Sequence, residues 1–108
     1  MTKEQEFYRE ALKTPVSTKK AIDMIFKDID RYETSDISWV ELTIYLIKLA
    51  NKYKVGIPSF SDIEYLMEGL DRNHTGRVSK KNIQPLLERI LDIKAGFAKL
   101  DCLYYTIF

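Results

Sequence analysis

The sequence predicts an all-α domain in which a helix–loop–helix unit occurs twice. Three observations support this prediction: apolar residues recur at helical spacing in four long segments, each unit contains a loop of the same length, and the apolar positions of the two units coincide. The chain has 108 residues, of which 45% are apolar and 31% charged, which is enough for one globular domain. We expect an N-terminal helical part over residues 1–17, the repeated units over 18–95 and an apolar tail over 96–108.

The first expected element is a short helix over residues 3–13. Its narrow apolar stripe has helical spacing and consists of Phe7, Tyr8, Ala11 and Leu12. Pro15 ends this helix, because the residue before a proline avoids the helical region. Ser17 is then predicted to cap a second helix that begins at about Thr18.

The first unit comprises the helix from about Thr18 to Ile29, a twelve-residue segment over residues 30–41, and another helix. The apolar face of the first helix consists of Ala21, Ile22, Ile25, Phe26 and Ile29. The apolar face of the second helix consists of Leu42, Tyr45, Leu46 and Leu49. Both sets follow the i, i+3/i+4, i+7 pattern of an amphipathic helix.

The second unit repeats the first at a distance of 41 residues along the chain. Its entering helix carries Ile63, Leu66, Met67 and Leu70, and its exiting helix carries Ile83, Leu86, Leu87 and Ile90. In both units apolar side chains precede the twelve-residue segment by one, four, five and eight positions, and follow it by the same intervals. Pro85 lies inside the exiting helix, where we expect a kink or a new helix start near Gln84.

The connection between the units contains Gly56 and Pro58, which indicate a helix end and a turn. Ser59 or Ser61 is expected to cap the helix that follows.

The segment over residues 71–82 has the pattern of a calcium-binding loop. Oxygen-bearing side chains occupy its positions one, three, five and nine, namely Asp71, Asn73, Thr75 and Ser79. Gly76 stands at position six, where such a loop turns sharply, and Val78 stands at position eight.

On these residues the chain resembles a pair of EF-hands, with loops over residues 30–41 and 71–82. In that family the two loops lie side by side, and the residues at position eight form a small antiparallel bridge. The resemblance therefore implies contact between Ile37 and Val78. Four amphipathic helices in another bundle remain the alternative.

Each loop lacks part of the usual ligand set. The second loop has Asn82 where a bidentate glutamate is expected, and its charges sum to +3. The first loop has Asp30 and Glu41 at positions one and twelve and a net charge of −3, but Tyr32 and Ser35 replace a ligand and the glycine. We expect no resident cofactor, with calcium or magnesium bound at low affinity at most and more readily by the first loop.

Weak or vestigial metal contacts are assigned to the oxygen positions of both loops. The set is Asp30, Thr34, Asp36, Ser38, Glu41, Asp71, Asn73, Thr75, Arg77, Ser79 and Asn82. Because the two loops have opposite charge, we hypothesise that a contact such as Arg77 to Asp36 replaces the charge of the metal ion.

The tail is unusually apolar for a chain end. Its large side chains are Phe97, Leu100, Leu103, Tyr104, Ile107 and Phe108. Such a surface is rarely left in water, so the tail is expected to fold back onto the helices or to bind a partner.

Other chemistry is weakly represented. One histidine, His74, and one cysteine, Cys102, form no nucleophile–base pair, so we do not expect an enzyme. The net charge of +1 argues against nucleic-acid binding, and the longest apolar stretch is too short to span a bilayer. The absence of a cysteine pair and of an apolar leader favours a cytoplasmic protein, with a cytoskeletal or axonemal place among the options.

The resemblance implies a binding module that holds an amphipathic helix of a protein partner, largely without calcium, as light chains do within larger assemblies. The expected groove floor consists of Ile25, Phe26, Leu46, Leu49, Met67, Leu86, Leu87 and Ile90. Two alternatives are a calcium sensor with a weak site and a homodimer of the calgranulin type.

Overall fold

Five helices and two short strands form the part of the chain that the computed structural model describes, residues 2–30, 35–71 and 74–99. In chain order they are α1 (Lys3–Ala11), α2 (Pro15–Ile29), β1 (Asp36–Ser38), α3 (Trp39–Lys52), α4 (Phe60–Leu70), β2 (Arg77–Ser79) and α5 (Lys80–Lys94). The predicted all-α character is confirmed at this level, with one small antiparallel strand pair added to the helices.

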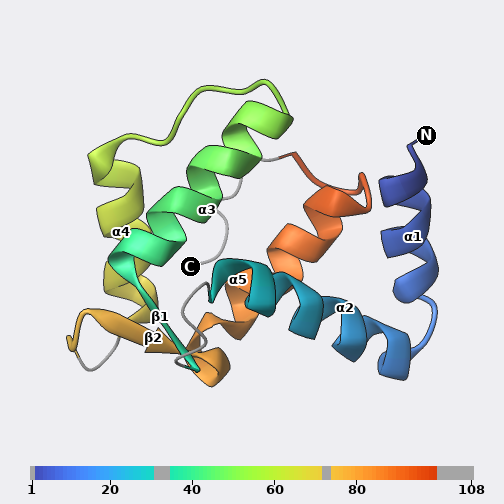
Figure 1. Cartoon of the computed structure of the whole chain (residues 1–108), viewed down its shortest axis with the longest axis horizontal. Helices are drawn as coiled ribbons and strands as arrows, with labels where there is room; N and C mark the ends of the chain where they lie inside the picture. Colours follow the sequence, from blue (N-terminus) through green and yellow to red (C-terminus); the bar gives the residue numbers. More distant parts are fainter. Residues whose placement is uncertain (1, 31–34, 72–73, 100–108) are drawn as a thin grey trace.

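The two strands pair in antiparallel register, with Ile37 opposite Val78. This is the contact that the resemblance implied, and both side chains are fully buried. The pairing joins the segment between α2 and α3 to the segment between α4 and α5 (Figure 1). The helix α1 lies at the end of the molecule away from the strands (Figure 1).

Serine and threonine side chains mark every helix start, as N-cap preferences predict. Ser59, rather than Ser61, caps α4 and forms a capping box with Asp62. The prediction that Ser17 caps α2 is wrong, because Thr14 is the N-cap and Pro15 occupies the first helical position. A proline is well suited to that position, since its missing N–H would have no helical partner there.

The helix α5 runs without interruption from Lys80 to Lys94, so the predicted restart near Gln84 is wrong. Pro85 removes one backbone hydrogen bond from the helix. Both Leu86 and Leu87, which follow it directly, are fully buried. Burial of these side chains offsets the missing bond, because most of the stability of a helix in a protein comes from packing.

The end of α3 also differs from the prediction that Gly56 marks it. The helix ends at Lys52, and Lys54 takes the left-handed conformation with φ of 56°. The N–H of Val55 then donates to the carbonyl oxygen of Ala50 at 3.0 Å. This is the hydrogen bond of a Schellman motif, formed here with lysine in the place that glycine usually takes.

Candidate functional site

The two predicted loops have the same backbone conformation where they begin. Asp30 and Asp71 end α2 and α4 with ψ angles of 72° and 71°. In each loop the carboxylate accepts the N–H of the sixth residue, at 3.0 Å from Ser35 and 2.7 Å from Gly76. These sixth residues have φ angles of 71° and 81°. Ser35 therefore has a positive φ, as we expect for the sixth position of such a loop, where glycine is usual.

Replacing Ser35 with glycine is expected to raise the free energy of unfolding by about 1 kcal/mol. The φ of 71° costs an L-residue free energy that glycine does not lose. Urea denaturation followed by circular dichroism measures the change. Gly76→Ser should lower stability by a similar amount, and an unchanged midpoint for Ser35→Gly would contradict the assigned strain.

The second loop closes around its own carboxylate. Oδ1 of Asp71 accepts the N–H of Thr75 at 3.0 Å, and Oδ2 accepts that of Gly76 at 2.7 Å. Burial opposes ionisation of Asp71, but these hydrogen bonds outweigh it and lower the pKa of the carboxyl group. The loop is thus held in shape by backbone donors of its own.

An ion pair joins the two loops beside the strands. Nε of Arg77 lies 2.5 Å from Oδ1 of Asp36, and its Nη2 donates to the carbonyl oxygen of Asp36 at 3.2 Å. The same Nη2 lies 3.8 Å from Oε1 of Glu41. The hypothesised contact between Arg77 and Asp36 is therefore present, and it extends toward the carboxylate at position twelve of the first loop.

Glu41 has a carboxylate that is only partly satisfied. Its side chain is 1% exposed, and Oε1 accepts from the N–H and the hydroxyl of Ser38 at 3.1 and 3.0 Å. Oε2 is buried and has no hydrogen-bond partner among the residues that the structure describes. A buried carboxylate oxygen without a donor is costly, and a cation is one group that would satisfy it.

Several of the other predicted metal residues have structural roles at the helix starts. Ser38 and Ser79 cap α3 and α5, and the N–H of Asn82 donates to the hydroxyl of Ser79 at 3.2 Å. Thr34 and Asn73 lie outside the described residues. Within the described ranges, no group of three or more His, Cys, Asp or Glu side chains is arranged to hold a metal ion.

The expected groove floor lies inside the molecule. None of its eight side chains is more than 7% exposed, and all belong to one apolar core: Ile25, Phe26, Leu46, Leu49, Met67, Leu86, Leu87 and Ile90. The structure brings the predicted residues together in one closed core between the packed helices, and their role as the floor of a partner groove stays a prediction.

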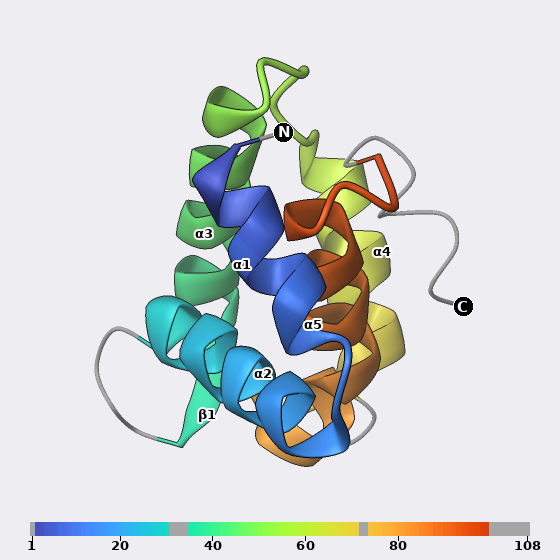
Figure 2. The same ribbon diagram turned by 90° about the vertical axis from the view of Figure 1, so that its right-hand side faces the viewer.

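The helix α1 contributes to this closed core. It buries Tyr8 and Ala11 in the core and packs against α2 and α5 (Figure 2). Arg9 donates from Nε to the carbonyl oxygen of Ala95 at 2.6 Å, just beyond the end of α5. The guanidinium group also stacks 4.5 Å from the ring centroid of Phe97, a tail residue that is 62% exposed.

Two lysines from different helices meet one glutamate of α1. Glu4 pairs with Lys52 at the end of α3 and with Lys94 at the end of α5, the latter at 3.2 Å. The ammonium group of Lys94 also lies 5.5 Å from the ring centroid of Tyr8. Sequence reasoning missed this cluster, because the charged partners are 48 and 90 residues apart and no local pattern links them.

The contribution of Glu4 to stability is expected to depend on pH. Burial opposes ionisation, but the hydrogen bonds and charges of Lys52 and Lys94 outweigh it and lower the pKa of Glu4. A lowered folded-state pKa stabilises the fold above about pH 4.5, and this contribution is lost as pH falls through the folded value. In urea denaturation, the stability difference between the wild type and Glu4→Gln should shrink between pH 6 and 3. A difference that stays constant would contradict this role.

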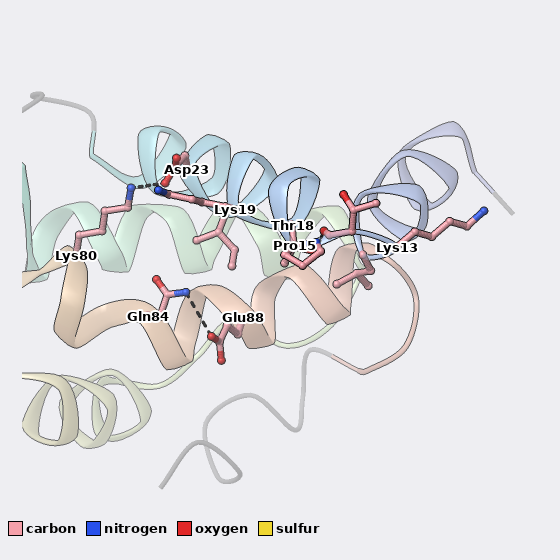
Figure 3. A pocket seen from close by; sticks show the side chains of 11 residues that line it. Lys13, Pro15, Thr18, Lys19, Asp23, Lys80, Gln84 and Glu88 are labelled. Carbon is pink, nitrogen blue, oxygen red and sulfur yellow. Dashed lines mark hydrogen bonds and ion pairs between the residues drawn. The ribbon is translucent and has the colours of Figure 1, made fainter.

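A separate cleft of about 690 Å³ lies between α2 and α5 (Figure 3). Its rim is polar, with Lys80 paired to Asp23 and the Gln84 amide donating to Glu88 at 3.3 Å. The buried Ile22 lines its floor. Leu12 and Pro15 also line this cleft, which contains none of the eight residues of the predicted groove.

The remaining predicted tail residues, Leu100, Leu103, Tyr104, Ile107 and Phe108, lie outside the described residues, as does Cys102. His74 is exposed in the second loop, with φ of 54°. Among the described helices, none has the combined length and hydropathy that crossing a bilayer requires.

Comparisons of the chain with protein-family models, with curated proteins and with solved structures found no match.

Proposed function

We propose that the chain is a protein-binding module built on a pair of EF-hands with degenerate loops, and that it holds an amphipathic helix of a protein partner without calcium. The observation that carries this proposal is the pairing of the two loops through Ile37 and Val78, reinforced by the ion pair between Arg77 and Asp36. In this interpretation the loops brace the helices and no longer need an ion.

The charges of the loops support independence from calcium. Arg77 brings a cation from the second loop to Asp36 and toward Glu41 of the first. In the second loop, Asn82 cannot supply the two carboxylate oxygens that calcium takes at position twelve. Both oxygens of Asp71 already accept loop donors. The paired loops are thus stabilised by groups of the chain itself.

The apolar interior supports helix binding. Four helices, α2 to α5, enclose large aliphatic side chains at i, i+3/i+4 and i+7 spacing. Helix-in-groove recognition uses such a surface, and the partner contributes anchors at the same spacing. A partner helix would reach this surface by displacing part of its present cover.

Selection from a library of helical peptides tests the proposal. The full chain, immobilised in EDTA, should enrich amphipathic peptides with apolar anchors at i, i+4 and i+7. Their affinity should be the same within about twofold when calcium replaces EDTA. Permuted peptides of identical composition that lack this spacing are the matched control. Equal binding of ordered and permuted peptides, or enrichment of none, would refute the proposal.

A weak cation site in the first loop is the second candidate function, favoured by the unpartnered Oε2 of Glu41. With Asp30 at position one, the loop has a net charge of −3, which attracts a divalent ion. Titration calorimetry should then detect calcium or magnesium binding with Kd on the order of 0.1–1 mM. Glu41→Gln should abolish the signal, and an absence of heat in the wild type at about 10 mM calcium would exclude the site.

A further inference from the structure

We propose that α1 occupies the position of the partner helix, and that the preferred partner reproduces the pattern of α1. That pattern is a carboxylate facing Lys52 and Lys94, an aromatic ring one turn later and a small residue after it, as in Glu4, Tyr8 and Ala11. The inference rests on the proposed function of helix binding and specifies which helices the chain accepts.

The position of α1 is the first observation. It lies across the end of the molecule opposite the strand pair, with α2, α3 and α5 around it (Figures 1 and 2). It packs against α2 and α5 and reaches α3 through the contact of Glu4 with Lys52. A partner helix that approached the apolar interior from this end would find its position occupied by α1.

The small apolar contact of α1 is the second observation. Of its nine residues only Tyr8 and Ala11 are buried, whereas α5 buries seven. Phe7, the largest apolar side chain beside them, is 51% exposed. Helices of this length are marginal in water on their own, so α1 depends on this small contact to stay in place.

The charge of Lys94 makes the position selective. Its side chain is 8% exposed, and its ammonium group contacts the carboxylate of Glu4 and the ring of Tyr8. A buried ammonium group without a carboxylate is strongly unfavourable. A helix that replaces α1 must therefore bring an acidic side chain to the same place, and a basic helix is disfavoured there by both lysines.

The short connection between α1 and α2 determines how strongly the attached α1 competes with a free helix for the same position. Only residues 12–14 separate α1 from α2, so α1 faces its own binding position at a high effective concentration. A free copy of α1 should consequently bind the wild-type chain weakly and bind tightly when the attached α1 is loosened.

The test uses a fluorescent peptide of residues 2–13 and the full chain, with binding measured by anisotropy. Glu4→Ala in the protein should increase affinity for this peptide about tenfold, because the attached helix loses its two lysine contacts. Glu6→Ala is the matched control: it removes the same charge from an exposed place on the same helix and should change affinity less than twofold.

Peptide variants test the recognition pattern. Against Glu4→Ala protein, peptides with Glu4→Gln or Tyr8→Ala should bind at least about tenfold more weakly than the native peptide. Charge reversal provides a second check on the recognition pattern. Lys52→Glu, at a half-exposed side chain, also loosens the attached α1, so it is compared with Glu4→Ala protein: the preference for the native peptide over a Glu4→Lys peptide should be smaller in Lys52→Glu protein, while Lys94 keeps part of that preference.

Hydrogen exchange identifies what the peptide displaces. On peptide binding, amides of α1 should lose protection while those of α5 keep it. Equal affinities of Glu4→Ala and Glu6→Ala, retained protection of α1, or exchange of α1 between two copies seen as a dimer in sedimentation would overturn the inference.

Failure of the inference is distinguishable from failure of the proposed function. If library-selected helices bind while α1 stays protected, helix binding stands and the role of α1 is refuted. If no helix binds either the wild type or Glu4→Ala, both are refuted.

Discussion

Leu86→Ala is expected to lower the free energy of unfolding of the isolated chain by about 2–5 kcal/mol. Leu86 is fully buried in α5, and its removal leaves a cavity that the surrounding helices fill only in part. Urea denaturation monitored by circular dichroism measures the loss. This large effect distinguishes a closed core from an open groove, in which the same side chain would contribute little until a partner bound.

The control for this variant is Lys81→Ala, an exposed change on the same helix that should alter stability by less than about 0.5 kcal/mol. If Leu86→Ala cost no more than the control, the side chain would have to be solvent-accessible in the free protein. The groove would then be open without a partner, contrary to the burial found here.

Arg77→Leu is expected to lower the free energy of unfolding by about 1–3 kcal/mol. The contact with Asp36 is largely exposed and contributes about 0–1 kcal/mol. The larger part comes from Glu41, whose buried carboxylate loses the nearby guanidinium group. Lys81→Leu removes a positive charge from an exposed place in the first turn of α5 and serves as the control for net charge.

A double-mutant cycle attributes this loss to the buried carboxylate. Glu41→Gln in the Arg77→Leu background should restore part of the stability, because a neutral amide costs less to bury than an unpaired carboxylate. Strictly additive effects of the two substitutions would show that Arg77 does not act through Glu41.

Local and repeated patterns predicted the elements that depend on neighbouring residues. The spacing of apolar residues located the four long helices, and the resemblance to paired EF-hand loops implied the contact of Ile37 with Val78. The opposite charges of the two loops predicted the contact between Arg77 and Asp36. The helices could be predicted because their spacing lies within one unit, and the contacts between loops because the two loops are equivalent and were expected to lie side by side.

Two other predictions were wrong because more than one rule applied to the same residues. Thr14 and Ser17 are both good N-caps, and the preference of proline for the first helical position decided for Thr14. Pro85 is unfavourable within a helix, yet the buried Leu86 and Leu87 maintain α5 through it. For α5 the outcome depended on free energies of packing that a local pattern does not contain.

The sequence by itself determined two equivalent units and loops whose ligand sets are incomplete, since these depend on residue type and spacing. Only the tertiary structure decided that α1 covers the apolar interior and that Glu4 meets Lys52 and Lys94. It also revealed the unpartnered oxygen of Glu41. The physical reason is that burial and long-range charge pairing arise when distant segments meet, and the periodicity of one segment carries no information about which other segment will cover it.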